Sequence, residues 1–231
     1  MGDSSKPRVS DQDVCCYAYD GDIANLKKQL QKNQSLSAVT DQAKRTPLHW
    51  ACSSGQQDIA SFLLNAANVE VNVVDDSMWT PLHIATSAGH TGIVMLLLGK
   101  NASANVKNQT GQTPLHYAAS KNRYDIANEL IQSGADVNIT DNTNACPIHR
   151  AAALGHLKML QLLLANGALI DATDISGNTP LHLACEDGNN ECAVTLVKKG
   201  ANLTVRNTEE KTPIDYASRG LAKKLQELLE M

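Results

Sequence analysis

Histidine is the residue type whose number here could support chemistry, because imidazole is the usual acid–base catalyst and a common metal ligand. Five of the seven histidines lie at separations of 34, 33, 33 and 33 residues: His49, His83, His116, His149 and His182. Equal spacing indicates one structural position repeated, whereas a reactive site needs its residues to converge. We therefore predict that each imidazole binds backbone or hydroxyl groups in neighbouring turns.

Cysteine is the second candidate for chemistry. No two of the six cysteines form a Cys-x-x-Cys pair or a zinc-module spacing, so we predict reduced, structural thiols in a reducing compartment. They are Cys15, Cys16, Cys52, Cys146, Cys185 and Cys192. The chain also has no glycine-rich phosphate loop and no His-Glu-x-x-His or Gly-x-Ser-x-Gly motif. We expect a protein that is not an enzyme and has no metal or other cofactor.

Each of the five spaced histidines is the fourth residue of a recurring hexapeptide. Its six copies begin at Thr46, Thr80, Thr113, Cys146, Thr179 and Thr212. Threonine can cap a helix by accepting a hydrogen bond from a free N–H group, and proline suits the first helical position. A short helix is therefore predicted to begin at each copy. The period and the Thr-Pro-Leu-His pattern resemble those of ankyrin repeats.

A second helix is predicted in each repeat. Residues that tolerate a positive φ angle follow the first helices, at Gly55, Gly89, Asn122, Gly155 and Gly188. Apolar runs at 59–64, 93–98, 126–131, 157–164 and 192–197 then indicate the second helices. Extended segments should lead from them to β-turn tips that project away from the helices.

The resemblance implies an all-α repeat solenoid of seven ankyrin repeats, curved and with a concave binding face. We expect a flexible tail at residues 1–10 and one domain at 11–231. The predicted repeats are 11–40, 41–74, 75–107, 108–140, 141–173, 174–206 and 207–231. The first copy lacks Thr-Pro and the last has a polar second helix over 221–229, as expected of terminal caps.

The net charge and the distribution of apolar residues indicate which classes of partner to expect. The formal net charge of the 231 residues is −4, which gives no electrostatic reason to expect nucleic acid. The polar residues 1–10 and the absence of a long apolar run predict no signal peptide and no membrane partner. We expect a monomer.

Binding specificity should lie at the positions that differ between repeats, because the repeated residues build the scaffold. Variable residues that we expect on the concave face, with both signs of charge, suit a partner of complementary charge. Trp79, at a turn tip, is expected to be an exposed aromatic anchor. The candidates are Asp41, Arg45, Asp75, Asp76, Trp79, Lys121, Arg123, Arg150, Glu186 and Asp187.

Structural alternatives apply to several of these residues. The tip residues Asp41, Asp75, Asp141 and Asp174 could serve only to accept hydrogen bonds from turn N–H groups. Arg45 and Lys121 could be solvated charges, although arginine can also hold a carboxylate with two hydrogen bonds. Trp50 could be a packing residue.

Several runs resemble the gankyrin family. They are residues 40–42, 45–46, 49–53, 113–123, 149–153 and 157–159, and of these 120–123 and 149–153 are specific because they depart from the general ankyrin pattern. The resemblance implies a non-ATPase chaperone for assembly of the proteasome regulatory particle, which clasps the C-terminal domain of an AAA-ATPase subunit. Arg45 and Lys121 would pair with acidic residues of that subunit, and Asp41, Asp76 and Glu186 with basic ones. The resemblance also implies a cytoplasmic and nuclear location.

Animal gankyrins are also associated with a cyclin-dependent kinase, a p53-directed ubiquitin ligase and the retinoblastoma protein. The last association involves a Leu-x-Cys-x-Glu motif. Here Leu183-Ala184-Cys185-Glu186 places the glutamate one residue early and within a predicted first helix. This departure argues against retinoblastoma binding.

The alternative function is a regulatory ankyrin-repeat inhibitor of a kinase or a transcription factor. A pull-down distinguishes the two, because an assembly chaperone should recover proteasomal ATPase subunits and an inhibitor should not.

Overall fold

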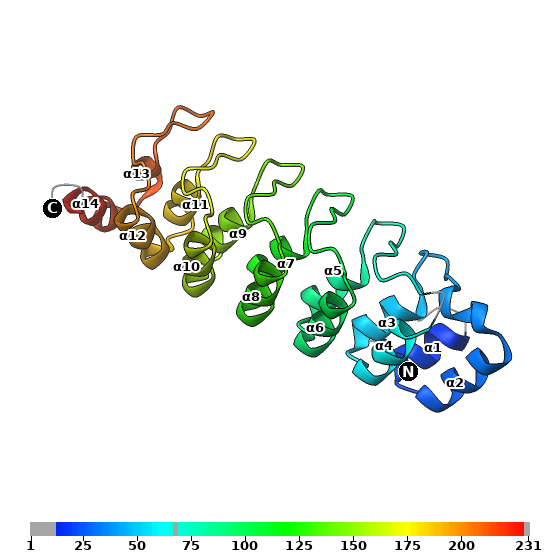
Figure 1. Cartoon of the computed structure of the whole chain (residues 1–231). Coiled ribbons are helices and arrows are strands. Elements are labelled where there is room, and N and C mark those ends of the chain that lie inside the picture. Colours follow the sequence, from blue (N-terminus) through cyan, green and yellow to red (C-terminus); the bar gives the residue numbers. More distant parts are fainter. Residues whose placement is uncertain (1–12, 67–68, 229–231) are drawn as a thin grey trace, which may run out of the picture. The chain divides into compact units, whose positions relative to one another are not determined.

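The fold consists of helix pairs joined by projecting loops (Figure 1). The computed structural model describes residues 13–66 and 69–228, and none of these residues forms a β-strand. The predicted tail at 1–10 and the ends of the first and last predicted repeats lie outside the described residues. The prediction of paired helices is confirmed, and the exact repeat boundaries stay a prediction. The chain divides into two compact units, Met1–Gln109 and Thr110–Met231.

The described residues of the first unit form three helix pairs and one short 3-10 helix. They are α1 (Asp13–Asp20), α2 (Ile23–Lys32), η1 (Gln34–Ala38), α3 (Pro47–Ser54), α4 (Gln57–Leu64), α5 (Pro81–Ala88) and α6 (Thr91–Gly99). The first helices pack in order, α1 on α3 and α3 on α5, and α4 packs on α6.

The described residues of the second unit form four helix pairs. Its elements are α7 (Pro114–Ser120), α8 (Tyr124–Gln132), α9 (Pro147–Ala153), α10 (Leu157–Ala165), α11 (Pro180–Glu186), α12 (Asn190–Lys198), α13 (Pro213–Tyr216) and α14 (Arg219–Glu227). Helix α7 packs on α9, α9 on α11 and α11 on α13, while α8, α10, α12 and α14 form the second row. α14 covers most of the predicted second helix of the last repeat, whose residue 229 is not described.

The predicted start and stop signals determine where the first helices begin and end. Pro47 and Pro81 are first helical residues, preceded by Thr46 and Thr80 in an extended conformation. Gly55 ends α3 with a φ angle of 79°, as the positive-φ prediction required. An alanine at that position would have to adopt this left-handed backbone conformation, which glycine reaches without a Cβ clash.

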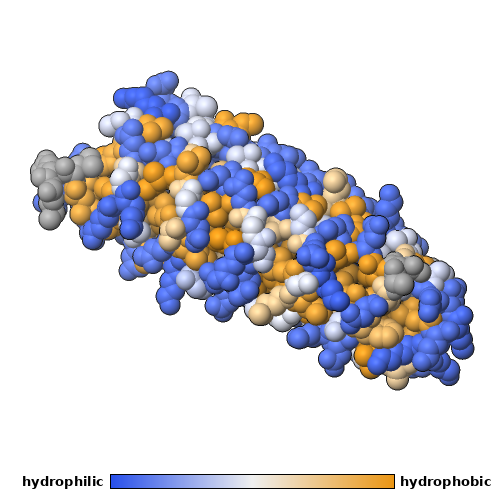
Figure 2. Space-filling view, in the orientation of Figure 1, coloured by the Kyte–Doolittle hydropathy of each residue, from blue (hydrophilic) through white to orange (hydrophobic). Residues whose placement is uncertain are grey.

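The core is thin and lies between neighbouring helix pairs. Leu48, Ala51 and Leu63 are fully buried in the first unit, and Leu115 and Ala118 in the second. Small alanines let the first helices approach closely, while leucines fill the space between layers. In the view of Figure 2, hydrophilic side chains cover much of the surface of both units, and hydrophobic patches are visible among these hydrophilic side chains. None of the described helices is long and apolar enough to cross a membrane.

Candidate functional site

The spaced histidines join neighbouring repeats. In the first unit, the Nδ1 atom of His49 accepts a hydrogen bond from the Thr46 N–H at 3.1 Å, and its Nε2 atom lies 3.1 Å from the Trp79 carbonyl oxygen of the next tip. In the second unit, the Nε2 atoms of three histidines bond next-tip carbonyls in the same way: His116 to Ala145, His149 to Asn178 and His182 to Lys211. The predicted structural role of these imidazoles is therefore confirmed.

Burial keeps these groups unreactive. Desolvation lowers the pKa of His49 to about 4 and also lowers the pKa values of His149 and His182, so the rings are neutral at pH 7. Desolvation raises the pKa of Cys146 to about 11 and that of Cys185 to about 12, which disfavours the nucleophilic thiolate. Among the described residues, no group of His, Cys, Asp or Glu side chains is placed to hold a metal ion.

The tips of the first unit are built around two aspartates. Asp41 Oδ1 accepts hydrogen bonds from the Ala43 and Arg45 N–H groups at 2.9 and 2.8 Å. Asp75 Oδ1 accepts bonds from the N–H groups two and four residues later at 2.9 and 2.8 Å. The turn interpretation of these carboxylates is thus correct, and Asp75 is buried rather than part of an exposed acidic patch.

Arg45 connects the two tips. Its Nε atom donates to Asp75 Oδ2 at 3.1 Å, and its guanidinium carbon lies 5.4 Å from the centre of the Trp50 ring. Trp50 is buried and its Nε1 donates to Asp41 Oδ2 at 2.9 Å. The Arg45 side chain remains 34% exposed. The stacked guanidinium is therefore held in one orientation with part of its donor set open to a partner.

The remaining first-unit candidates differ in exposure. Asp76 is exposed, and its N–H donates to the Ala43 carbonyl of the preceding tip at 2.9 Å. Trp79 is half-buried, not fully exposed as an anchor at a tip would be, because its ring lies 5.8 Å from the His83 ring. Trp79 could thus contribute only part of its ring to an interface.

Arg150, in the second unit, is committed to an internal pair. Its Nη2 atom donates to Asp141 Oδ2, and Asp141 Oδ1 accepts from the Thr143 N–H at 2.8 Å and the Ala145 N–H at 3.1 Å. Burial alone would raise the pKa of Asp141, but the hydrogen bonds from Thr143 and Arg150 outweigh it and lower the pKa to about 2. Arg150 therefore contributes less free positive charge than the sequence analysis assumed.

This pairing recurs nine residues apart within a repeat. The first tip residue bonds the side chain nine positions later in Asp41–Trp50, Asp141–Arg150 and Asn207–Tyr216, the last at 2.9 Å. This pairing was not predicted from the sequence. The signal that could have revealed it is a hydrogen-bonding side chain in the position after the repeated histidine.

Lys121, Leu154 and Asp187 form a row at the ends of three successive first helices in the second unit. They are the residues that cap α7, α9 and α11, each 33 residues apart, and these helices pack side by side. Lys121 and Asp187 are exposed, as are their neighbours Arg123 and Glu186. We call Lys121, Leu154 and Asp187 the inner row.

Leu154 is a binding candidate that the sequence analysis did not single out. Its side chain is 52% exposed between a cationic and an anionic neighbour in the inner row. Ile175, at a tip of the same unit, is 71% exposed. A large apolar residue at a variable position was the available signal in both cases, and such residues anchor interfaces when they become buried.

The segment that resembles the retinoblastoma-binding motif lies in α11. Cys185 is buried and Leu183 is half-buried, so neither apolar residue of the motif is fully open to a partner. This arrangement agrees with the displaced glutamate in arguing against the interaction.

Comparison with family models identifies ankyrin repeats over most of the chain. The model described as ankyrin repeats (3 copies) matches residues 66–141, 92–174 and 148–231, and the single ankyrin repeat model matches 44–76. These matches include all six hexapeptide copies.

Two similar proteins are the 26S proteasome non-ATPase regulatory subunit 10 of Rattus norvegicus and of Homo sapiens. They are 48% and 49% identical to this chain over 72 residues. The matched segment covers 31% of this chain and 31% of each relative. The chain thus matches less than one third of the length of these curated relatives.

Among solved structures, the ankyrin repeat domain of Bcl-3, described as a member of the IκB protein family, is similar with a TM-score of 0.83. The alignment covers 98% of this chain and 100% of that one at 23% identity, which supports the shared fold alone.

Proposed function

Because the chain belongs to the ankyrin-repeat family, we propose that it is a non-enzymatic protein-interaction scaffold that assists assembly of the proteasome regulatory particle. The observation that carries the proposal is the identity of nearly one half to proteasome regulatory subunit 10 over 72 residues. These relatives are gankyrins, so they confirm the resemblance to the gankyrin family. The prediction that the chain is not an enzyme is also confirmed by this family membership.

The proposed partner is the C-terminal domain of an AAA-ATPase subunit. Arg45 is oriented by Trp50 and Asp75 yet partly exposed, so it can receive a partner carboxylate without losing much side-chain freedom. In the inner row, Lys121 and Asp187 offer both signs of charge on either side of exposed Leu154. Such an apolar residue with charged neighbours matches the usual anatomy of an interface, an apolar core with a polar rim.

We further propose that the protein acts in the cytoplasm and nucleus, where the regulatory particle would be met. Binding of a cyclin-dependent kinase and of a p53-directed ubiquitin ligase remains part of this proposal through the family resemblance. The packed Leu183 and Cys185 give no support to a retinoblastoma partner.

Affinity purification of the full chain at physiological salt tests the partner class. Recovery of proteasomal AAA-ATPase subunits supports the proposal. Recovery of a kinase or a transcription factor without those subunits would instead favour a regulatory inhibitor and overturn it.

Charge reversal then tests the residues. We expect Arg45→Glu combined with Lys121→Glu to weaken binding of the ATPase C-terminal domain by about 2–5 kcal/mol, the cost of leaving interface charges unpaired. Calorimetry measures the affinity, and circular dichroism checks that the helix content is unchanged. Lys158→Glu, an exposed charge reversal on α10, is the matched control. Equal affinity of the double variant and the control would refute this assignment of the site.

A further inference from the structure

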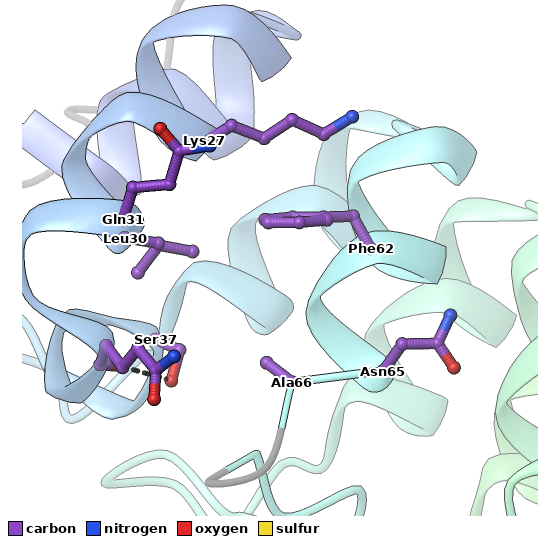
Figure 3. A pocket seen from close by; sticks show the side chains of 8 residues that line it. Lys27, Leu30, Gln31, Ser37, Phe62, Asn65 and Ala66 are labelled. Carbon is purple, nitrogen blue, oxygen red and sulfur yellow. Dashed lines mark hydrogen bonds between the residues drawn. The ribbon is translucent and has the colours of Figure 1, made fainter.

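A cavity of about 390 Å³ lies between α2 and α4 in the first unit (Figure 3). Leu30 of α2 and Phe62 of α4 face each other across it, with Ala66 at one end. Elsewhere in this unit the second helices close on each other, since α4 packs directly on α6. None of the ten candidate binding residues lines the cavity.

The α2–α4 cleft, as we call it, is bordered by η1, which follows α2. Residues Gln34 to Ala38 form this extra 3-10 helix, which contacts α2 and α3, and buried Ser37 donates to the Gln34 carbonyl oxygen at 2.9 Å. η1 therefore lies at the lower end of the cleft without filling the space between Leu30 and Phe62 (Figure 3). The Phe62 ring is left partly accessible in the cleft, and Leu30, at 6% exposure, forms its floor.

The walls of the cleft come from α2 and from the end of α4. Lys27, Leu30 and Gln31 are spaced i, i+3 and i+4 on α2, so they lie on one side of that helix. Phe62 on α4, with Asn65 and Ala66 just beyond its end, forms the opposite wall. A groove with an apolar floor and a helix face as one wall can receive the apolar face of an amphipathic helix.

The charged side chain that lines the cleft is Lys27, and it is positive. Its Nζ atom lies 5.2 Å from the centre of the Phe62 ring at the mouth, and Lys28 and Lys32 are exposed on the same helix without lining the cleft. In the part of the chain that the structure describes, none of these three lysines forms an ion pair. Lys100 Nζ adds a fourth ammonium group, 2.8 Å from Asn65 Oδ1. Asp58, one turn before Phe62, is the nearest carboxylate in sequence and does not line the cleft.

We propose that the α2–α4 cleft is a second protein-binding site, which takes an amphipathic helix whose apolar face is flanked by acidic residues. The apolar side chains of the bound helix pack between Leu30 and Phe62. A carboxylate of that helix forms an ion pair with Lys27, whose ammonium group then moves away from the Phe62 ring. The exposed amide groups of Gln31 and Gln34 are available to the polar edges of that helix, whereas Asn65 is bonded to Lys100 and to the Ser61 carbonyl oxygen. This site is independent of the inner row and of Arg45, so it does not depend on the proposed ATPase partner.

A synthetic helix tests the site on the full chain. The probe is a capped peptide of Leu, Glu and Ala with leucines at helical spacing and glutamates beside them, and its control has every Glu replaced by Gln. Amide shifts of the isotopically labelled protein are followed by NMR up to about 1 mM peptide, the range of weak peptide binding. We expect saturable shifts confined to α2, η1 and α4, and weaker binding as salt is raised.

Matched variants decide whether the charges matter. Lys27→Glu should weaken binding of the acidic helix by about fivefold or more, while Lys158→Glu, the same charge change on α10, should leave it unchanged. No shifts by about 1 mM, equal binding of the Gln control, or shifts centred on other helices would overturn the proposal. Dodecanoate is added separately, and binding of this apolar carboxylate in place of the acidic helix would also overturn it in favour of a small-molecule site.

Discussion

Asp215 shows what the fourth residue of the hexapeptide must supply. Its Oδ2 atom accepts hydrogen bonds from the Thr212 N–H and hydroxyl groups, both at 2.7 Å. In the other copies the imidazole Nδ1 accepts the corresponding N–H, and Nε2 is left to bond the next tip, as in His49. A carboxylate oxygen can thus replace Nδ1 of the histidine as the acceptor for the N–H of the capping residue. It cannot replace Nε2, which forms the hydrogen bond to the next repeat.

At the residue scale, Asp141 offers a test that separates the turn from the ion pair. Asp141→Asn keeps a carbonyl oxygen for the turn N–H groups, as Asn207 does at 3.0 and 3.1 Å in its own tip. We expect it to lower the free energy of unfolding by about 1 kcal/mol, and Asp141→Ala by about 2–3 kcal/mol, since alanine leaves turn donors unpaired. Urea unfolding with an unchanged m-value measures both. Equal losses would show that the turn bonds contribute little.

At the scale of elements, helix boundaries were predictable because their signals are local. Threonine before proline starts the first helices, and a positive-φ residue ends them, as at Gly55 and Asn122. The 3-10 helix η1 was not predicted, because residues 34–38 carry no proline, glycine or apolar period that marks such a turn. The α2–α4 cleft is lined in part by η1, so it could not be predicted either.

Two glycines of the first unit test these boundaries in opposite directions. A Cβ atom on Gly55 would come within 2.7 Å of the His90 ring and the φ angle is 79°, so Gly55→Ala should destabilise the protein by about 1–3 kcal/mol. A Cβ atom on Gly99, in α6, meets nothing within 4 Å. Gly99→Ala should therefore stabilise it by about 0.5–1 kcal/mol through helix propensity. Thermal unfolding measures both, and a shift in the same direction for both variants would contradict this explanation.

At the scale of the whole molecule, the fold was largely predictable and the site only partly so. A fixed period places the same local signals along the chain, so one hexapeptide marks the first helix of every repeat after the first. The side-chain pairs between tips depend on tertiary distances that no single repeat contains. Asp75 was therefore expected to be exposed but is buried against Arg45, and Arg150 was expected to be available but bonds Asp141. Lys121 and Asp187 are exposed, as variable positions were expected to be.

The buried histidines, which recur in both units, predict an acid-sensitive fold. Burial lowers the pKa of His49 to about 4, below the ordinary value of about 6.5, and lowers those of His149 and His182. Between these pH values the unfolded chain binds more protons than the folded one, so the free energy of unfolding falls as the pH is lowered. A protonated Nδ1 could no longer accept the Thr46 N–H, which is the structural reason for the loss.

We expect His49 alone to account for a loss on the order of 2 kcal/mol between pH 7 and pH 5. Urea unfolding at pH 7, 6 and 5 measures the slope. The pKa of Asp141, about 2, places the titration of that carboxylate below this window, so its ion pair with Arg150 does not contribute to the slope. Stability that stays constant or rises between pH 7 and pH 5 would mean that the imidazoles are already charged in the folded protein. In that case the Nδ1 atom of His49 would carry a proton, and it would not accept the hydrogen bond from the Thr46 N–H.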